Sequence, residues 1–226
     1  MRIVGGKWRG LSVEAPEGRG TTRPTTDRNR ERFASMILSA AGLDLSGVEV
    51  LDAFAGSGAM GFELVSRGAA RAVFVDLDRR AVARIRRTAE RSLHADASEW
   101  RALAGDACAL AEQGRIPGGP FGVVFLDPPY VVEASRVASL VAALADRGQL
   151  EQGAVVVYEH ASGSAGIDGE GLPLSKSKSQ GATTVDLMIA DPEGIRNRCS
   201  LTNRRSCMWS CRAPSTRSRW GTSTSS

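Results

Sequence analysis

Residues 48–58 read VEVLDAFAGSG, and this stretch decides the fold. The apolar run Val48–Ala53 predicts a buried strand, which carries Asp52 just before the glycines Gly56 and Gly58. Glycine lets the backbone turn tightly and approach a ligand, and the amides at the start of the following helix point toward it. The stretch therefore predicts a strand, a ligand-binding turn and a helix.

The same alternation of apolar runs and helical periods continues along the chain. Apolar strands joined by crossover helices are typical of a parallel, doubly wound α/β sheet. After the fifth strand, Leu172–Ser179 and Thr183–Ile189 predict an antiparallel hairpin around Gln180-Gly181, so we expect a mostly parallel sheet of seven strands. The predicted parallel strands are Val48–Ala53, Ala72–Asp76, Ala102–Ala104, Gly122–Leu126 and Ala154–Glu159, and the predicted helices are Ala59–Ser66, Arg79–Arg91, Ala107–Glu112 and Ala134–Asp146.

Two further segments flank this pattern. Arg2–Gly6 and Leu11–Glu14 predict a small N-terminal β-hairpin, and Thr25-Thr26-Asp27 supplies helix caps before a helix that ends near Gly42. We divide the chain into an N-terminal basic extension (1–24), a main α/β domain (25–191) and an atypical tail (192–226). The tail is rich in Arg, Ser, Cys and Trp without a hydrophobic period, which indicates disorder or translation of a shifted reading frame, and we assign it no function.

Length and composition favour one globular domain in a chain of 226 residues with a net charge of +4. Residues 1–32 hold eight basic and four acidic residues, whereas residues 33–191 hold 14 and 20. A basic arm on an acidic domain favours a nucleic-acid partner, although a solvated charged surface has the same pattern. No apolar run reaches the ~20 residues of a membrane span, and the cysteine spacing predicts neither a metal site nor disulfides. We expect a cytoplasmic protein.

Three groups of residues follow the first three strands and are candidates for holding a ligand. The run Gly56-x-Gly58-x-x-Gly61 also matches the dinucleotide pattern, but Asp52 favours a cationic amino-acid group, such as the methionine end of S-adenosylmethionine, over a pyrophosphate. Asp76, with Asp78 as the fallback, can accept hydrogen bonds from two ribose hydroxyls. Asp106 can accept from an adenine amino group or cap a helix, and Ala107 can offer its amide.

The most specific motif is Asp127-Pro128-Pro129-Tyr130, directly after an apolar strand. Two prolines end the strand in a rigid loop at the carboxyl edge, where doubly wound sheets bind ligands. The Asp127 carboxylate and the Pro128 carbonyl can accept hydrogen bonds from an exocyclic amine and aim its lone pair. Tyr130 offers a flat face to an unstacked base, an interaction worth ~1–3 kcal/mol.

These motifs, in this order, resemble class I methyltransferases that modify exocyclic amines. The segments Gly5-Gly6-Lys7-Trp8-Arg9-Gly10 and Arg23-Pro24-Thr25-Thr26-Asp27-Arg28-x-Arg30-Glu31 are similar to the bacterial 16S rRNA (guanine-N2)-methyltransferase family, over roughly residues 1–190. The chain departs from that family at Ser179-Gln180-Gly181, where an aromatic residue usually precedes the glycine, so a base contact there is not carried over.

The resemblance implies a Rossmann-like class I methyltransferase fold and a set of roles. S-adenosylmethionine would be the cofactor and S-adenosylhomocysteine the product. The implied partner is 16S rRNA in the small ribosomal subunit or its assembly intermediate, met by a monomer. By the same resemblance, the target pocket comprises Asp127, Pro128, Pro129 and Tyr130, the cofactor site comprises Asp52, Phe54, Ala55, Gly56, Ser57, Gly58, Asp76, Leu77, Asp106 and Ala107, and RNA would meet Lys7, Arg9, Arg23 and Arg28.

Three other functions share parts of this pattern. A DNA adenine-N6 or cytosine-N4 methyltransferase uses the same Asp-Pro-Pro-Tyr chemistry but generally carries an added recognition region. An NAD-dependent dehydrogenase would account for the glycines and leave residues 127–130 unexplained. A non-catalytic RNA-binding protein would account only for the basic arm.

Overall fold

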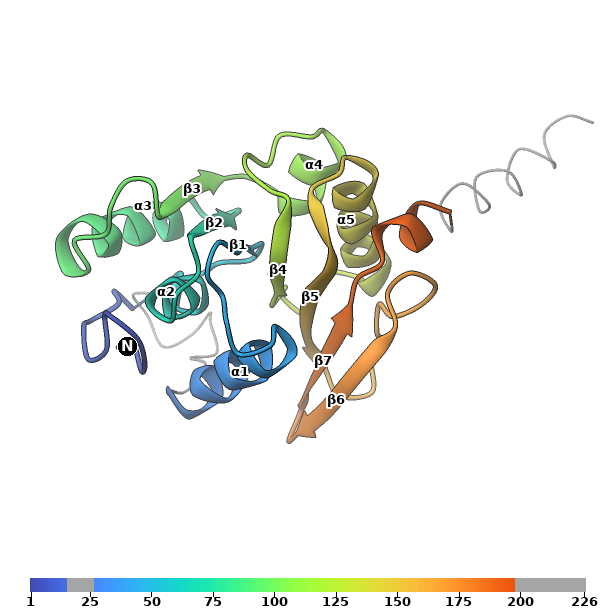
Figure 1. Cartoon of the computed structure of the whole chain (residues 1–226), viewed down its shortest axis with the longest axis horizontal. Coiled ribbons are helices and arrows are strands. Elements are labelled where there is room, and N and C mark those ends of the chain that lie inside the picture. Colours follow the sequence, from blue (N-terminus) through green and yellow to red (C-terminus); the bar gives the residue numbers. More distant parts are fainter. Residues whose placement is uncertain (16–26, 198–226) are drawn as a thin grey trace, which may run out of the picture.

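The computed structural model describes residues 1–15 and 27–197, with the side chains of residues 27 and 28 left undescribed (Figure 1). Helices and strands alternate along most of the chain, as predicted. The helices are α1 (Asp27–Ala40), α2 (Ala59–Ser66), α3 (Arg79–Arg87), the π-helix η1 (Thr88–Ser92), α4 (Ala107–Glu112) and α5 (Ala134–Asp146). The strands are β1 (Glu49–Asp52), β2 (Arg71–Asp76), β3 (Trp100–Ala104), β4 (Phe121–Leu126), β5 (Leu150–Ala161), β6 (Leu174–Gln180) and β7 (Thr183–Ile189).

One seven-stranded sheet organises the molecule, in the order β3-β2-β1-β4-β5-β7-β6. The first five strands are parallel, whereas β7 pairs antiparallel with both β5 and β6. The predicted fold class is therefore confirmed, including the closing hairpin. The strand order reverses direction between β1 and β4, and doubly wound sheets bind ligands at the carboxyl ends of the strands beside such a reversal.

Alternate residues of the central strands are buried in two different hydrophobic cores, one on each face of the sheet. Val50 and Phe74 pack with α1, α2 and α3, whereas Leu51 and Val73 pack with α4 and α5. Side chains on a strand point to opposite faces in turn, so a strand covered on both faces reads as a continuous apolar run. This explains why β4 is buried at all six positions.

The N-terminal hairpin packs into the first of these cores. Its two arms meet through a bridge between Arg2 and Ser12, and Ile3, Trp8 and Val13 are buried. The fully buried Glu63 of α2 accepts hydrogen bonds from the amides of residues 4 and 5, at 2.8 and 2.9 Å. The predicted hairpin is present, and it is anchored to the domain by buried contacts.

Arg30 of α1 is buried to 1% exposure and ties that helix to the hairpin. Its Nη2 donates to the carbonyl oxygen of Arg2 at 2.8 Å. A buried guanidinium needs such acceptors, because an unpaired charge away from water is costly. Arg30 belongs to the segment that resembles the rRNA methyltransferase family, and its visible role is to hold the N-terminal segments together.

The predicted tail begins with ordered structure. Residues 192–197 form a helical turn in which Ile195 is buried, and Nη1 of Arg196 donates to the carbonyl oxygen of Ala145 at 2.8 Å. This turn packs because Gly171 leaves room for the backbone of residues 194 and 195. Residues 198–226 lie outside the described residues. Across residues 1–15 and 27–197, no helix is long and apolar enough to cross a membrane.

Candidate active site

The glycine loop after β1 is held at the carboxyl edge by its neighbouring strands. The Ala53 amide donates to Phe125 of β4 at 3.1 Å, and the Ala55 amide donates to Val75 of β2 at 2.9 Å. Gly56 and Gly58 have φ angles of 55° and 75°, which glycine adopts without strain. A Cβ atom at Gly56 would meet nothing within 4 Å, so the turn has open space beside it.

Asp76 lies directly against this turn. Its Oδ2 accepts from the Gly56 amide at 2.7 Å, and its Oδ1 accepts from the Asp78 amide at 2.8 Å. Asp78 instead caps α3 by accepting from the Arg80 amide at 2.8 Å. Leu77, between them, is 76% exposed and offers an apolar surface beside the carboxylate. The arrangement suits a ribose at Asp76 and a flat purine over Leu77, and leaves Asp78 a structural role.

Asp52 is buried, and its side chain points to the start of α2. Its Oδ2 accepts from the Gly61 amide at 3.1 Å. Burial raises the pKa of this carboxyl to about 7, the Gly61 hydrogen bond opposes the rise, and the nearby Asp76 adds to it. Asp52 can thus respond to a cationic ligand group, but in the structure its partner is the helix.

The remaining cofactor candidates in the glycine loop differ in how deeply they are buried. Phe54 and Ser57 are partly buried, and Ala55 is buried. The Ser57 hydroxyl oxygen accepts from the Ala59 amide at 3.4 Å, inside the first turn of α2. These residues shape the turn through their backbone, which is what a loop that cradles a ligand requires.

Asp106 caps α4 and also forms an ion pair that sequence reasoning missed. Its Oδ1 accepts from the Cys108 and Ala109 amides, at 3.0 and 3.3 Å, while Nη2 of Arg136 lies 2.9 Å from Oδ2. Burial, the largest influence, would raise the pKa of Asp106, but the Ala109 amide, Arg136 and the Cys108 amide together lower it. A contact with an adenine amino group would have to share this carboxylate with Arg136.

The Asp-Pro-Pro-Tyr loop follows β4 at the same edge. Asp52, the last residue of β1, is paired with Phe125 of the parallel strand β4. Asp127 therefore lies two residues past the level at which β1 ends. Pro128 is buried, whereas Tyr130 is 56% exposed and presents its ring to solvent. The Tyr130 hydroxyl lies 3.2 Å from Oγ1 of Thr183, at the tip of the β6–β7 hairpin. The sequence did not predict this contact, because no local pattern distinguishes Thr183 from its neighbours.

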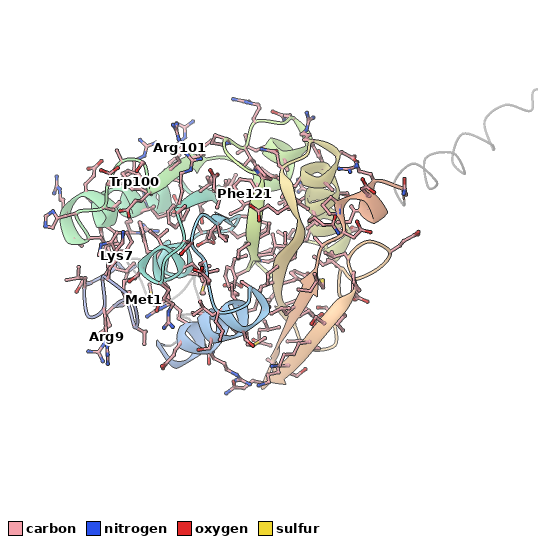
Figure 2. All side chains as sticks on the ribbon, viewed as in Figure 1. Met1, Lys7, Arg9, Trp100, Arg101 and Phe121 are labelled. Carbon is pink, nitrogen blue, oxygen red and sulfur yellow. The ribbon has the colours of Figure 1, made fainter. Side chains whose placement is uncertain are left out.

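Two of the candidate RNA-binding residues, Lys7 and Arg9, lie on the N-terminal hairpin and not at this edge. Lys7 pairs with Glu99, lies 4.4 Å above the Trp8 ring, and its backbone amide bonds to Ser66 at the far end of α2 from the glycine loop. Arg9 points outward from the hairpin (Figure 2). Arg23 and the side chain of Arg28 lie outside the described residues.

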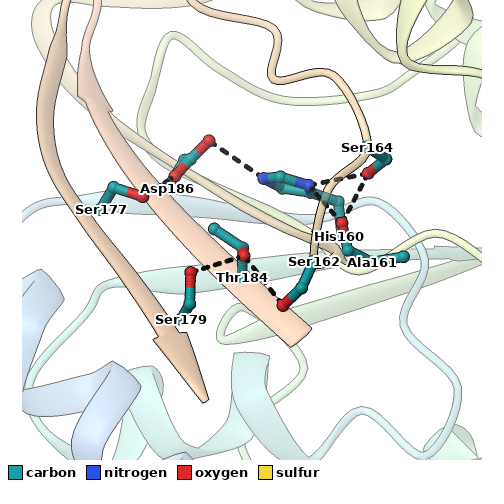
Figure 3. A network of polar contacts seen from close by, with 8 residues as sticks. All are labelled: His160, Ala161, Ser162, Ser164, Ser177, Ser179, Thr184 and Asp186. Carbon is teal, nitrogen blue, oxygen red and sulfur yellow. Dashed lines mark hydrogen bonds and ion pairs between the residues drawn. The ribbon is translucent and has the colours of Figure 1, made fainter. Parts of the chain in front are cut away.

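A buried polar network stiffens the hairpin that carries Thr183 (Figure 3). His160 of β5 is 6% exposed, and its Nε2 lies 3.0 Å from Oδ2 of Asp186 on β7. Ser177 of β6 donates to the other oxygen of Asp186 at 2.5 Å. The Asp186 carboxylate thus links β5, β6 and β7, while Ser179 of β6 instead contacts the Thr184 hydroxyl at 2.8 Å.

Comparisons with known proteins show to which family the chain belongs. Residues 1–189 match the sequence model of the family described as Conserved hypothetical protein 95. The chain belongs to this family. Ribosomal RNA small subunit methyltransferase D of Escherichia coli strain K12 is 33% identical over 159 residues, which cover 70% of this chain and 74% of that protein. The enzyme with the same name from Haemophilus influenzae is 28% identical over 187 residues, covering 83% and 92%.

Solved structures also place the chain in this family's fold. An Escherichia coli protein named as a methyltransferase is 29% identical with a TM-score of 0.71, covering 85% of this chain and 98% of its own. Magnesium protoporphyrin IX methyltransferase from Synechocystis, solved with bound S-adenosylmethionine, has a TM-score of 0.54 at 13% identity and is alike in fold alone. The expected class I methyltransferase fold and the expected resemblance to the small-subunit rRNA methyltransferases are both confirmed.

Proposed function

We propose that this protein transfers a methyl group from S-adenosylmethionine to the exocyclic N2 of a guanine in 16S rRNA of the small ribosomal subunit. The observation that carries the proposal is the position of Asp127-Pro128-Pro129-Tyr130, which follows β4 beside the glycine loop of β1. Membership of the family and relatives named as small-subunit rRNA methyltransferases support the reaction and the substrate class.

The chain's own residues would bind and orient the target amine. Its lone pair is delocalised into the base ring, so it is a poor nucleophile until it is aimed. Hydrogen bonds from the amine to the Asp127 carboxylate and the Pro128 carbonyl would aim the lone pair and stabilise positive charge on nitrogen. The exposed Tyr130 ring would stack on the flipped base.

The cofactor supplies the methyl group as an electrophile on a sulfonium. As the N–C bond forms, the S–C bond breaks and its electron pair stays on sulfur, so that S-adenosylhomocysteine is the product. The amine then loses one proton, for which Asp127 is the acceptor within the proposed pocket. Asp76 and the open turn at Gly56 are the residues that fit the ribose end of the cofactor.

The finer points of partner and place belong to the same proposal. The protein would act as a monomer in the cytoplasm, on a small subunit or an assembly intermediate of it. The guanine must be unpaired or flipped to reach Tyr130, because a base stacked in a duplex has no free face for the tyrosine ring and cannot enter the pocket.

The test is methyl transfer from labelled S-adenosylmethionine to small subunits that lack their native modifications, with free rRNA and duplex DNA alongside. The product would be digested to nucleosides. Label in N2-methylguanosine from subunits is the expected result. Label only in DNA adenine or cytosine would reassign the substrate, and label in no nucleic acid would contradict the proposal.

A further inference from the structure

A groove with a cavity volume of about 510 Å³ runs between α1 and β6. Three cationic side chains line it, Arg32 from α1 and Lys176 and Lys178 from β6, together with the single carboxylate of Glu31. The groove therefore carries a net positive charge, although it lies on a domain whose residues 33–191 are acidic overall. None of its residues belongs to the sites assigned above.

Alternation along β6 explains why both lysines face the groove. Every residue of β6 is exposed, and Ser177 turns to the opposite side to bond with Asp186. Lys176 and Lys178, two positions apart, then share the groove face with a spacing of about 7 Å along the strand. The whole sequence contains three lysines, and two of them stand here.

These two lysines differ in their partners from three of the protein's other cations. Lys7, Arg87 and Arg136 are paired with Glu99, Glu14 and Asp106. For the side chains of Lys176 and Lys178, no hydrogen bond or ion pair appears within residues 1–15 and 27–197. Exposed cations that form no ion pair stay available to attract a polyanion.

The groove is connected to the target pocket through the tip of the β6–β7 hairpin. Arg32 donates to the side chain of Gln180, and Gln180 is paired with Thr183. Thr183 contacts the Tyr130 hydroxyl at 3.2 Å. A strand of nucleic acid that leaves a base at Tyr130 can therefore pass over the tip and enter the groove.

We propose that this groove between α1 and β6 binds the phosphate backbone of the single-stranded RNA segment next to the target base, with Lys176, Lys178 and Arg32 as the phosphate contacts. This inference deepens the proposed function and rests on it for the identity of the RNA. It moves the principal RNA contact from the N-terminal hairpin to the hairpin that closes the sheet.

The experiment compares the parent protein with Lys176→Gln/Lys178→Gln in full-length chains. The control, Arg101→Gln/Arg115→Gln, removes the same charge from exposed positions, with Arg101 on β3 at the other edge of the sheet. Binding of a labelled single-stranded RNA 20-mer and of duplex DNA is measured over a series of salt concentrations. S-adenosylhomocysteine binding checks the fold of each variant, and the KM for small subunits is measured separately.

In the lysine variant, the slope of log affinity for RNA against log salt should shrink by about 1.4, since each single-strand phosphate contact contributes about 0.7. The KM for subunits should rise roughly tenfold, with little change in kcat. The control should match the parent. Three results would overturn the proposal that the groove binds RNA. These are equal salt slopes for all three proteins, no RNA binding by the parent, and a loss of affinity confined to duplex DNA. If the parent protein fails to transfer methyl groups but the lysine variant shows the expected change in the salt slope of RNA binding, the proposed function is overturned and the RNA-binding role of the groove is retained.

Discussion

Four aspartates stand at the carboxyl edge of the sheet, and their surroundings separate their chemistry. Asp52 is buried against α2, Asp76 holds the glycine turn, and Asp106 is shared between a helix cap and Arg136. Asp127 follows β4 in the loop that carries Tyr130. The same side chain is thus a helix support at Asp52, a proposed ribose acceptor at Asp76, a helix cap with an ion pair at Asp106 and the proposed acceptor for the target amine at Asp127.

Replacement of Asp127 tests the last of these roles. Asp127→Ala should lower kcat by roughly a hundredfold or more, because an acceptor aimed at developing charge is lost. Affinity for S-adenosylhomocysteine, measured by calorimetry, should stay within a few-fold of the parent. Asp146→Ala, at an exposed position at the end of α5, is the matched control and should retain full activity. Activity of Asp127→Ala within a few-fold of the parent would remove the assigned role.

The buried Asp52 should make the stability of the ligand-free protein depend on pH. Its pKa is raised from 3.8 to about 7 by burial, so between these values the folded protein holds a proton that the unfolded chain has released. Rising pH therefore destabilises the fold across this window, and the loss is complete above the folded pKa.

Asp52→Asn cannot ionise and should escape this loss. Its free energy of unfolding should exceed that of the parent by a difference that grows by roughly 1.4 kcal/mol for each pH unit inside the window. Urea unfolding of both proteins from pH 4 to pH 8 measures the difference. Two parallel curves would show that Asp52 does not titrate in this range.

At the scale of the elements, α2 packs on β2 at a position where only glycine fits. Gly61 lies in α2, where the third glycine of the sequence pattern falls, and a Cβ atom there would come within 2.3 Å of Cε1 of Phe74 on β2. The glycine is needed for close packing of a helix on a strand, as in dinucleotide-binding folds. A shared glycine pattern therefore reflects shared packing and does not by itself identify the ligand.

Gly61→Ala should destabilise the protein by about 1–3 kcal/mol despite the better helix propensity of alanine. The added methyl group has no room against the buried Phe74 ring. In Gly61→Ala/Phe74→Leu, the shortened side chain should recover part of the loss, so the two changes should be less costly together than their sum. Thermal unfolding of Gly61→Ala, Phe74→Leu and the double variant measures this coupling, and strict additivity of the two losses would contradict the contact.

The contact between the closing hairpin and the target loop can be tested by a double-mutant cycle. Thr183→Val removes the hydroxyl next to Tyr130 while keeping the shape of the side chain. A hydrogen bond of this kind contributes about 0.5–1.5 kcal/mol, so kcat/KM should fall by roughly two- to tenfold. In a Tyr130→Phe background the same change should have almost no further effect, and an undiminished effect there would show that Thr183 acts elsewhere.

At the scale of the whole molecule, the N-terminal hairpin is part of the catalytic domain's core. Trp8 is 7% exposed and meets Phe62 of α2 edge to face, with ring centroids 6.3 Å apart. An extension that only contacted RNA would not bury its tryptophan in this way. Deleting the hairpin would therefore confuse loss of stability with loss of RNA binding.

Trp8→Ala should lower the free energy of unfolding by about 3–5 kcal/mol, as expected for removal of a buried aromatic side chain. Arg9→Gln, one residue away and exposed, should leave stability unchanged. Urea denaturation of both variants decides the point. An equally small effect of both substitutions would mean that the hairpin is not integral to the fold.

The sequence by itself determined the class of the fold, and it predicted where along the chain the candidate site lies. Apolar runs separated by helical periods, the glycines after Asp52 and the two prolines after Asp127 are local features, readable because strand alternation and turn chemistry depend on neighbouring residues. The exact ends of the elements were harder to predict. The predicted helix over residues 79–91 is divided in the structure into α3 and η1, and the Leu93 amide bonds back to Thr88.

Only the tertiary structure decided how individual side chains are used. Arg136 meets Asp106 across 30 residues, Thr183 meets Tyr130 across 53, and Arg32 meets Gln180 across 148. It also showed that Lys7 is already paired, and that Lys176 and Lys178 line a groove between α1 and β6. Such contacts arise when distant segments pack on one sheet, and burial and charge at each position depend on those neighbours, which no local pattern in the chain encodes.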